Sequence, residues 1–418
     1  MAARSISGSF RIELLKQSGI VSAGRIFVLV LGVASIPVLT RLYNPEEYGL
    51  FSFYSTVITF ASSVILLSYN SAIIVSKNQS DKNHLVFACL ILLATGGVIS
   101  IPLGVFIDIT AGYEKSFLFI PIGIVIYGLT DIISKVNARA GRFSWVAKMD
   151  VSGNLLNKLF NLLLYPLGGI GLLVSDFIGQ SIVLLVNVIK KFNHKNYKPS
   201  LRKTIKILSG YKEYPIYIMP GNLLNRLAGH LPIFIVGSYF GNTTLGNLAV
   251  AITLLNVPVT VIGGSLSTVF TTRIAELGKE NVNEISNLTN SIFEKLLGLA
   301  IIPFACLMLF GDSLVVFVAG EQWRTAGEIV KIMAIYHLFH FAVNPLLNVF
   351  QVLKQERKVL HFSILSIVLN SISFGLGIYY SSFSLSIILY TISNTAISVL
   401  QGIAILNLAG LKSRGVQS

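Results

Sequence analysis

The sequence predicts an all-α polytopic membrane protein, and three observations lead to this fold class. Hydrophobic residues make up 53% of the 418 residues and charged residues only 12%, and the mean hydropathy is +0.74. The apolar residues are grouped into runs long enough to cross a bilayer as helices. Most of the 32 lysines and arginines fall between alternate runs, as the positive-inside rule expects. A soluble domain of this composition would expose large apolar patches, so we exclude that class.

Apolar runs of about 20 residues, each bounded by charges or turn residues, are the candidate transmembrane helices. The first run is expected to remain as a helix, because no small-residue cleavage site follows it. An even number of spans, with most cations in the segments between alternate runs, predicts that both termini are cytoplasmic. The twelve runs cover residues 18–40, 48–75, 84–107, 116–135, 149–167, 169–189, 214–239, 245–270, 291–311, 327–351, 360–380 and 383–409.

The most basic segment separates two halves of six runs each. It extends from Lys190 to Tyr214, and we interpret it as a solvated loop attracted to anionic lipid of the inner leaflet, with a gating role as the alternative. The formal charge of +14 would suggest nucleic acid in a soluble chain, but the placement of these cations between spans argues against that partner. The predicted domains are an N-terminal six-helix bundle (1–189), a basic linker (190–213) and a C-terminal six-helix bundle (214–418).

Two stretches point to an internal repeat. RLYNPEEYGLFSFYSTVITF surrounds Gly49 and GNTTLGNLAVAITLLNVPV surrounds Gly246. Each stretch follows a run that contains an arginine, and each places an exposed turn before a glycine and a helix. Two repeated halves are typical of secondary transporters.

The loops argue against chemistry and in favour of transport. The sequence has no GxxxxGK[ST] segment that would cradle the phosphates of a nucleotide. The expected outward loops are short and contain few acidic residues, so a membrane enzyme is not expected. No metal or haem spacing occurs, and we predict no cofactor and no metal site.

Cys89 and Cys306 lie inside apolar runs and are interpreted as small buried residues, with a disulfide as the alternative. Trp145 and Trp323 are predicted to anchor at the membrane interface.

Three runs carry a cation within a stripe of polar residues on one helical face. Such a charge is costly in lipid and should face the protein interior or a watery cavity. Together the cations would suit a pyrophosphate and hydroxyl-rich sugars, since arginine binds phosphate in bidentate fashion. Pairing with Asp131, Asp150 or Asp176, or snorkelling to the interface, is the structural alternative. The stripes are Ser18, Ser22 and Arg25; Asn154, Asn157, Lys158 and Asn161; and Asn222, Asn225, Arg226 and Gly229.

Three titratable residues are candidates for ion coupling. Asp176 lies a turn or two inside the sixth run, where a carboxylate could exchange protons. His337 and His340 form a stripe with Asn344 and Asn348 in the tenth run, and histidine changes its charge near physiological pH. Hydrogen bonding between helices is the alternative for each of them.

Five segments, taken in this order along a chain of twelve spans, resemble the bacterial polysaccharide transporters. These are the O-antigen and capsule-repeat (Wzx-type) flippases of the multidrug/oligosaccharidyl-lipid/polysaccharide exporter superfamily. The segments are LTRLYNPEEYGLFSFYS (39–55), SYNSAIIVSKN (68–78), YPIYIMPGNLLNRLAGHLPIFIVGSYFG (214–241), LGNLAVAITLLNVPVTVIGGSLSTVF (245–270) and VFQVLKQERKV (349–359).

The resemblance implies a flippase of the bacterial inner membrane, with two six-helix bundles around a central cavity. Such a protein moves undecaprenyl-pyrophosphate-linked oligosaccharide, as in O-antigen and lipopolysaccharide synthesis, from the inner to the outer leaflet by alternating access. Relatives use H+ or Na+ as the coupling ion and have arginines in the cavity, one of them in the first helix, which agrees with Arg25. A polysaccharide polymerase and a chain-length regulator stay open as partners. The alternatives are a drug antiporter of the same superfamily and a membrane polymerase.

Overall fold

The computed structural model describes residues 24, 27, 28, 30–111, 116–191, 200–277, 281–353 and 355–414. These residues form helices, turns and short irregular segments, and no strand occurs among them, which confirms the all-α fold class. Nine segments of the described chain are helices long and apolar enough to cross a membrane. They are Pro45–Ile65, Gln79–Ile109, Leu118–Arg139, Tyr165–Asn187, Gly241–Gly263, Asn283–Ala319, Glu321–Leu346, Arg357–Tyr379 and Phe383–Leu408.

The other three predicted runs also correspond to helices. The described part of the first run is the short apolar helix Val30–Leu42. The fifth and seventh runs are α6 (Phe143–Leu163) and α9 (Met219–Tyr239), of 21 residues each. These two contain the predicted polar stripes, which lower their hydropathy. The protein is therefore a polytopic membrane protein whose helices follow the order predicted from the sequence.

Packing divides the chain into two compact units. The first contains the chain up to Ser35 and Phe53–Leu223, and the second contains Ile36–Ser52 together with the chain from Leu224 onward. The three boundaries fall inside the helix Val30–Leu42, inside α2 (Pro45–Ile65) and inside α9. The division at the basic linker, with bundles at 1–189 and 214–418, stays a prediction.

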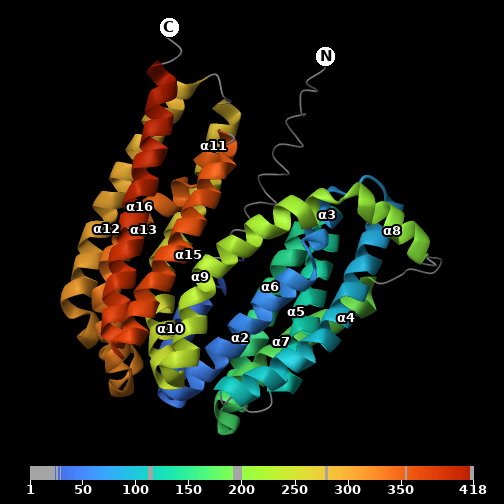
Figure 1. Ribbon diagram of the computed structural model, residues 1–418, viewed down its shortest axis with the longest axis horizontal. Coiled ribbons are helices and arrows are strands. Elements are labelled where there is room, and N and C mark those ends of the chain that lie inside the picture. The colour runs from blue at the N-terminus through green and yellow to red at the C-terminus, as the bar shows by residue number, and fades with distance from the viewer. Residues whose placement is uncertain are drawn as a thin grey trace. The chain divides into compact units, whose positions relative to one another are not determined.

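In the first unit, α4 (Gln79–Ala111) packs beside α5 (Ser116–Arg139), and α6 packs beside α7 (Gly168–Lys191) (Figure 1). The α6 and α7 backbones approach closely, because a Cβ at Gly179 would lie only 3.1 Å from Asn157 N and from Gly153 O. This close approach brings the polar stripe of α6 against the carboxylate-bearing turn of α7.

One predicted run is broken. Residues 48–75 read as a single apolar run, but α2 ends at Ile65 and α3 covers only Tyr69–Val75. Leu67 and Ser68 between them have φ values of 48° and 59°, in the left-handed region that non-glycine residues rarely adopt. Hydropathy did not reveal the break, because the few polar residues at Ser68–Ser71 are flanked by apolar residues on both sides.

The basic segment, predicted to be a loop, contains a helix. This helix, α8 (Leu201–Gly210), exposes Arg202, Lys203 and Ile205 and buries Thr204. The Thr204 hydroxyl lies 2.8 Å from His84 Nδ1, so α8 packs against the start of α4. A short amphipathic basic helix of this kind is suited to the membrane interface.

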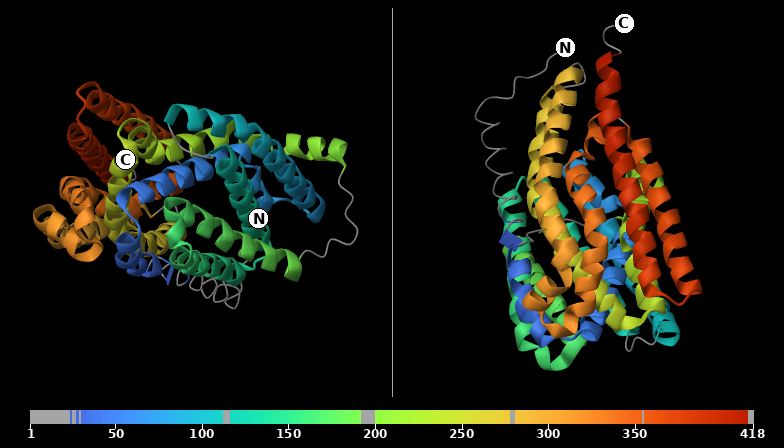
Figure 2. Two further views of the ribbon diagram at one scale, coloured as in Figure 1. Left: turned by 90° about the horizontal axis from the view of Figure 1, so that it is seen from below. Right: turned by 90° about the vertical axis from the view of Figure 1, so that its left-hand side faces the viewer.

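In the second unit, α9 is followed by α10 (Gly241–Pro258), a π-helical turn at Val259–Gly263 and α11 (Gly264–Leu277). Then follow α12 (Val282–Ala319), α13 (Arg324–Val343), α14 (Val349–Val352), α15 (Glu356–Tyr379) and α16 (Phe383–Arg414). Helix α13 contacts α10, α12 and α16, and α15 runs beside α16 (Figure 2).

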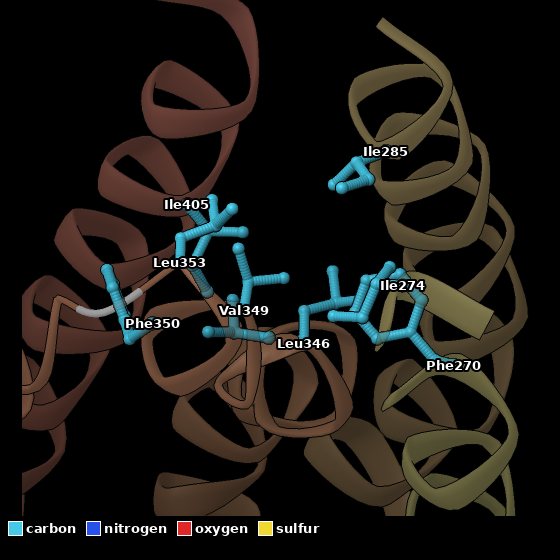
Figure 3. Packing of buried hydrophobic residues seen from close by; sticks show 9 residues of the cluster. Phe270, Ile274, Ile285, Leu346, Val349, Phe350, Leu353 and Ile405 are labelled. Carbon is cyan, nitrogen blue, oxygen red and sulfur yellow. The ribbon is translucent and has the colours of Figure 1, made fainter. Parts of the chain in front are cut away.

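A buried apolar cluster joins α11 to the segment after α13 and to α16 (Figure 3). Its residues are at most 3% exposed, and burial of such side chains contributes about 1.5 to 3 kcal/mol each. The cluster fixes the short, irregular chain that follows α13. Its members are Phe270, Ile274, Ile285, Val343, Leu346, Val349, Phe350, Leu353 and Ile405.

Two assignments of single residues were wrong. Trp323 is fully buried at 0% exposure, and its indole N–H donates to the Thr40 carbonyl at 2.8 Å; it packs inside the second unit instead of anchoring at an interface. Cys89 and Cys306 are free thiols, but only Cys89 is buried. Trp145 donates its indole N–H to Asn187 Oδ1 at 2.6 Å.

Candidate substrate and ion-coupling sites

The stripe of the first predicted helix lies outside the described residues, since Ser18, Ser22 and Arg25 are not among them. The role of Arg25 therefore stays a prediction. The stripes of α6 and α9 are described.

The polar stripe of α6 turns partly into the first unit. Asn157 and Asn161 are buried, Lys158 is half-buried and Asn154 bonds to the Asp150 carbonyl of its own helix at 2.8 Å. The Asn161 amide donates to Asn157 Oδ1 at 3.2 Å. The stripe thus begins near the helix surface at Asn154 and continues inside the unit as the hydrogen-bonded pair Asn157 and Asn161.

Asp176 of α7 accepts a hydrogen bond from this pair of asparagines, through Asn157. It is 8% exposed and accepts hydrogen bonds from the Tyr127 hydroxyl and from the Asn157 amide, the latter at 3.2 Å. The positive charge of Lys158 acts on the same carboxylate, but the two groups form no ion pair within 4.0 Å in the described chain. Asp176 is therefore a buried carboxylate held by neutral donors.

Sequence reasoning did not identify Tyr127, although it is the nearest donor to Asp176. It lies near the middle of α5, and only the packing of α5 beside α7 brings the two side chains together. A tyrosine inside a transmembrane run, away from its ends, was the available signal, because a buried hydroxyl requires a partner.

On α9 the polar stripe divides between two surroundings. Asn222 and Arg226 are exposed, and Arg226 has no carboxylate within ion-pair distance in the described part of the chain. Asn225 and Gly229, which lie together on one side of that line, contribute instead to a cavity of the second unit.

This cavity has a volume of about 420 Å³ and a lining in which amides, hydroxyls and aromatic rings predominate. His337 and His340 belong to the lining. His337 is 2% exposed, with Nδ1 at 3.1 Å from the Met333 carbonyl. The Tyr336 ring lies 4.5 Å from the His337 ring and 5.3 Å from the His340 ring, centroid to centroid. Other lining residues are Asn225, Asn256, Asn344, Ser363, Ser366, Tyr390, Asn394, Ser398 and Gln401.

The predicted stripe of the tenth run ends earlier than expected. Asn344 lines the cavity with the two histidines, but α13 stops at Val343 and the chain continues as a 3-10 turn. Asn348 points elsewhere and donates to Ser267 Oγ at 3.0 Å and Thr271 Oγ1 at 2.9 Å. Its role is to tie this segment to α11.

The described residues contain no group of three side chains that could hold a metal ion.

Residues 38–328 match the family described as "Polysaccharide biosynthesis protein". The chain belongs to this polysaccharide biosynthesis family. Membership confirms the resemblance to the polysaccharide transporters.

One curated relative is the "Teichuronic acid biosynthesis protein TuaB" of Bacillus subtilis (strain 168). It is 21% identical over 298 residues, which are 68% of this chain and 60% of TuaB. The match thus spans less than two thirds of the length of TuaB.

Two solved structures show the fold of this family member. A "Lipid II flippase MurJ, inward closed conformation" gives a TM-score of 0.75 at 13% identity, covering 93% of this chain and 86% of MurJ. An inward-facing multidrug resistance MATE family transporter of the MOP superfamily gives a TM-score of 0.70 at 15% identity, covering 93% and 99%. At these identities the likeness establishes the fold and leaves the substrate open.

Proposed function

We propose that this protein is a flippase that moves an undecaprenyl-pyrophosphate-linked oligosaccharide from the inner to the outer leaflet of the bacterial inner membrane. Transport proceeds by alternating access and is coupled to H+ or Na+. Membership of the polysaccharide biosynthesis family supports the substrate class. Both termini lie in the cytoplasm in this proposal, because the cations concentrate in segments on that side.

The observation that carries the proposal is the environment of Arg226. Its guanidinium lies exposed beside Asn222 on α9, without a carboxylate partner in the described chain. An unpaired arginine within a membrane helix is costly unless water or an anion meets it. A pyrophosphate is such an anion, and the planar fork of arginine binds it through two hydrogen bonds. Arg25, Lys158 and the side chains of Asn154, Asn157, Asn222 and Asn225 are the further candidates for substrate contact in this proposal.

Ion coupling is assigned to Asp176, with His337 and His340 as the second candidates. Asp176 combines burial, two hydrogen-bond donors and the nearby Lys158 charge. Protonation of the carboxylate would weaken both its hydrogen bonds and its attraction to Lys158. A proton or Na+ taken up there would therefore change the packing between α5, α6 and α7.

The test is glycan export in a strain that lacks its own flippase, at matched membrane levels of each variant. Wild type should restore surface polysaccharide, Arg226→Ala should leave it trapped inside, and Arg226→Lys should restore an intermediate amount. Arg357→Ala, at an exposed arginine of α15, is the matched control and should export normally. Equal export by Arg226→Ala and wild type would contradict the proposed site.

Two other functions make different predictions in the same strain. A drug antiporter would export cationic dyes such as ethidium and restore no glycan in any background. A polymerase would lengthen glycan that another flippase had already exported. The cationic stripes argue against the first, since cationic drugs favour acidic cavities, and the short outward loops argue against the second.

A further inference from the structure

A second cavity, separate from the candidate substrate residues, lies in the first unit between α4, α5 and α7. Its volume is about 450 Å³. Most of its lining is apolar, while three cations gather at one end. The lining residues that matter for the argument are Lys82, Leu90, Leu129, Ile133, Arg139 and Arg142.

The cationic end contains charge that the protein does not neutralise. Lys82 is 8% exposed, and its ammonium has no hydrogen bond or ion pair to the described residues. Arg139 donates through Nη2 to the carbonyls of Ser76 at 2.8 Å and Asn78 at 3.1 Å, which leaves its buried Nε without a partner. Arg139 and Arg142 both repel the Lys82 charge.

The neighbouring carboxylates are engaged elsewhere. Asp81 accepts a hydrogen bond from the Tyr211 hydroxyl at 3.2 Å. Asp131 accepts one from the Asn70 amide and lies 3.8 Å from Lys135. The side chain of Lys82 is mostly buried beside two guanidinium groups, and like charges held together in this way are unfavourable on their own. An anion bound between them would offset that cost.

The apolar part of the cavity indicates that the ligand has an apolar chain next to its anionic group. Leu90 lies eight positions along α4 from Lys82 and Leu129 ten positions along α5 from Arg139, so the apolar lining extends roughly 12 to 15 Å from the cations. Free phosphate would use the cations but leave this slot empty. A lipid would fill both parts.

The geometry points to a binding site for an anionic phospholipid, whose phosphate lies among Lys82, Arg139 and Arg142 and whose acyl chain follows the slot. The amphipathic helix α8 packs against the same end of α4, which places this end at the depth of lipid headgroups. The site contains neither Lys158 nor Arg226, so it is independent of the proposed flippase activity. We commit to a bilayer phospholipid, because none of the proposed substrate residues lines the cavity.

The experiment is native mass spectrometry of the full-length protein, released from nanodiscs of equal parts phosphatidylglycerol and phosphatidylcholine. Wild type should retain phosphatidylglycerol selectively. Lys82→Gln should weaken its retention about tenfold, as the loss of one charge-assisted hydrogen bond predicts. Ile133→Phe should weaken it by filling the slot. Lys77→Gln, at an exposed lysine of the same end, is the control and should behave as wild type.

Arg142→Gln is a further variant whose exposed side chain can change without loss of folding, and it should also weaken retention. Equal retention by wild type, Lys82→Gln and Arg142→Gln would overturn the proposal, as would equal retention of the two lipids. Two further ligands, inorganic phosphate and polyprenyl pyrophosphate, distinguish a phospholipid site from a site for another phosphate compound. If inorganic phosphate binds with the same dependence on Lys82 while Ile133→Phe changes nothing, the site is not a lipid site. If only polyprenyl pyrophosphate depends on Lys82, the bilayer phospholipid is the wrong ligand.

Discussion

Gly49 at the start of α2 packs against Gly246 at the start of α10, and the contact is reciprocal. A Cβ at Gly49 would overlap the Asn242 carbonyl, and a Cβ at Gly246 would overlap the Pro45 carbonyl. Each hypothetical Cβ would also lie 3.0 Å from the backbone N of the other glycine. Each carbonyl precedes its own glycine by four residues, so the two helix starts are arranged as equivalents. The sequence had already paired these two glycines as parts of a repeat.

Replacing either glycine by alanine should therefore separate the two helix starts. The obstructing atoms are backbone carbonyls, which cannot rotate away, so we expect Gly49→Ala and Gly246→Ala each to destabilise the protein by about 1 to 3 kcal/mol. Thermal unfolding in detergent would measure this loss. Gly298→Ala is the control, because a Cβ at Gly298 meets nothing within 4 Å and alanine favours the helix.

A second prediction concerns the Thr40 carbonyl, which accepts hydrogen bonds from both Trp323 Nε1 at 2.8 Å and Gln322 Nε2 at 2.6 Å. Trp323→Phe removes one donor and leaves the other, and the smaller ring leaves a cavity at this fully buried position, so we expect a loss of about 1 to 3 kcal/mol. Combining it with Gln322→Leu should cost more than the sum of the two single variants, since the buried carbonyl then has no donor. Additive losses in a double-mutant cycle would mean that water replaces the missing donors.

The course of the fold was predictable wherever hydropathy changed along the chain, as at the turn between α9 and α10. It was not predictable at Leu67 and Ser68, where a break interrupts an apolar run, or at α8, which is too short to resemble a span. The cavity of the second unit was missed for another reason. Asn225 and Tyr390 lie far apart in the sequence but line the same cavity, and a single sequence does not show which residues of different helices will share a cavity.

The two histidines of that cavity should make different contributions to transport. His337 Nδ1 lies 3.1 Å from the Met333 carbonyl, so His337→Asn should mainly reduce stability. His340→Gln retains a polar group in the wall, so the protein should fold normally. If His340 couples ions, the dependence of transport on external pH should weaken in that variant. An unchanged pH profile would assign His340 to the structure of the wall.

The last prediction concerns Asp176 and Tyr127. Asp176→Asn keeps the size of the side chain and a hydrogen bond to Tyr127, but it cannot exchange a proton. We therefore expect normal membrane levels and a loss of pH-dependent glycan export, measured in inverted vesicles with an imposed proton gradient. Normal export by this variant would remove Asp176 as a coupling group.

Tyr127→Phe removes the hydroxyl that donates to Asp176 and so tests whether the two residues act as a unit. We expect it to reduce export, because a buried carboxylate that loses a donor costs about 1 to 3 kcal/mol. In Asp176→Asn protein the same change should reduce export no further, since its partner is already neutral. Tyr239→Phe, at an exposed tyrosine at the end of α9, is the matched control. Independent, additive effects of the two substitutions would show that Tyr127 acts by packing and that Asp176 acts without it.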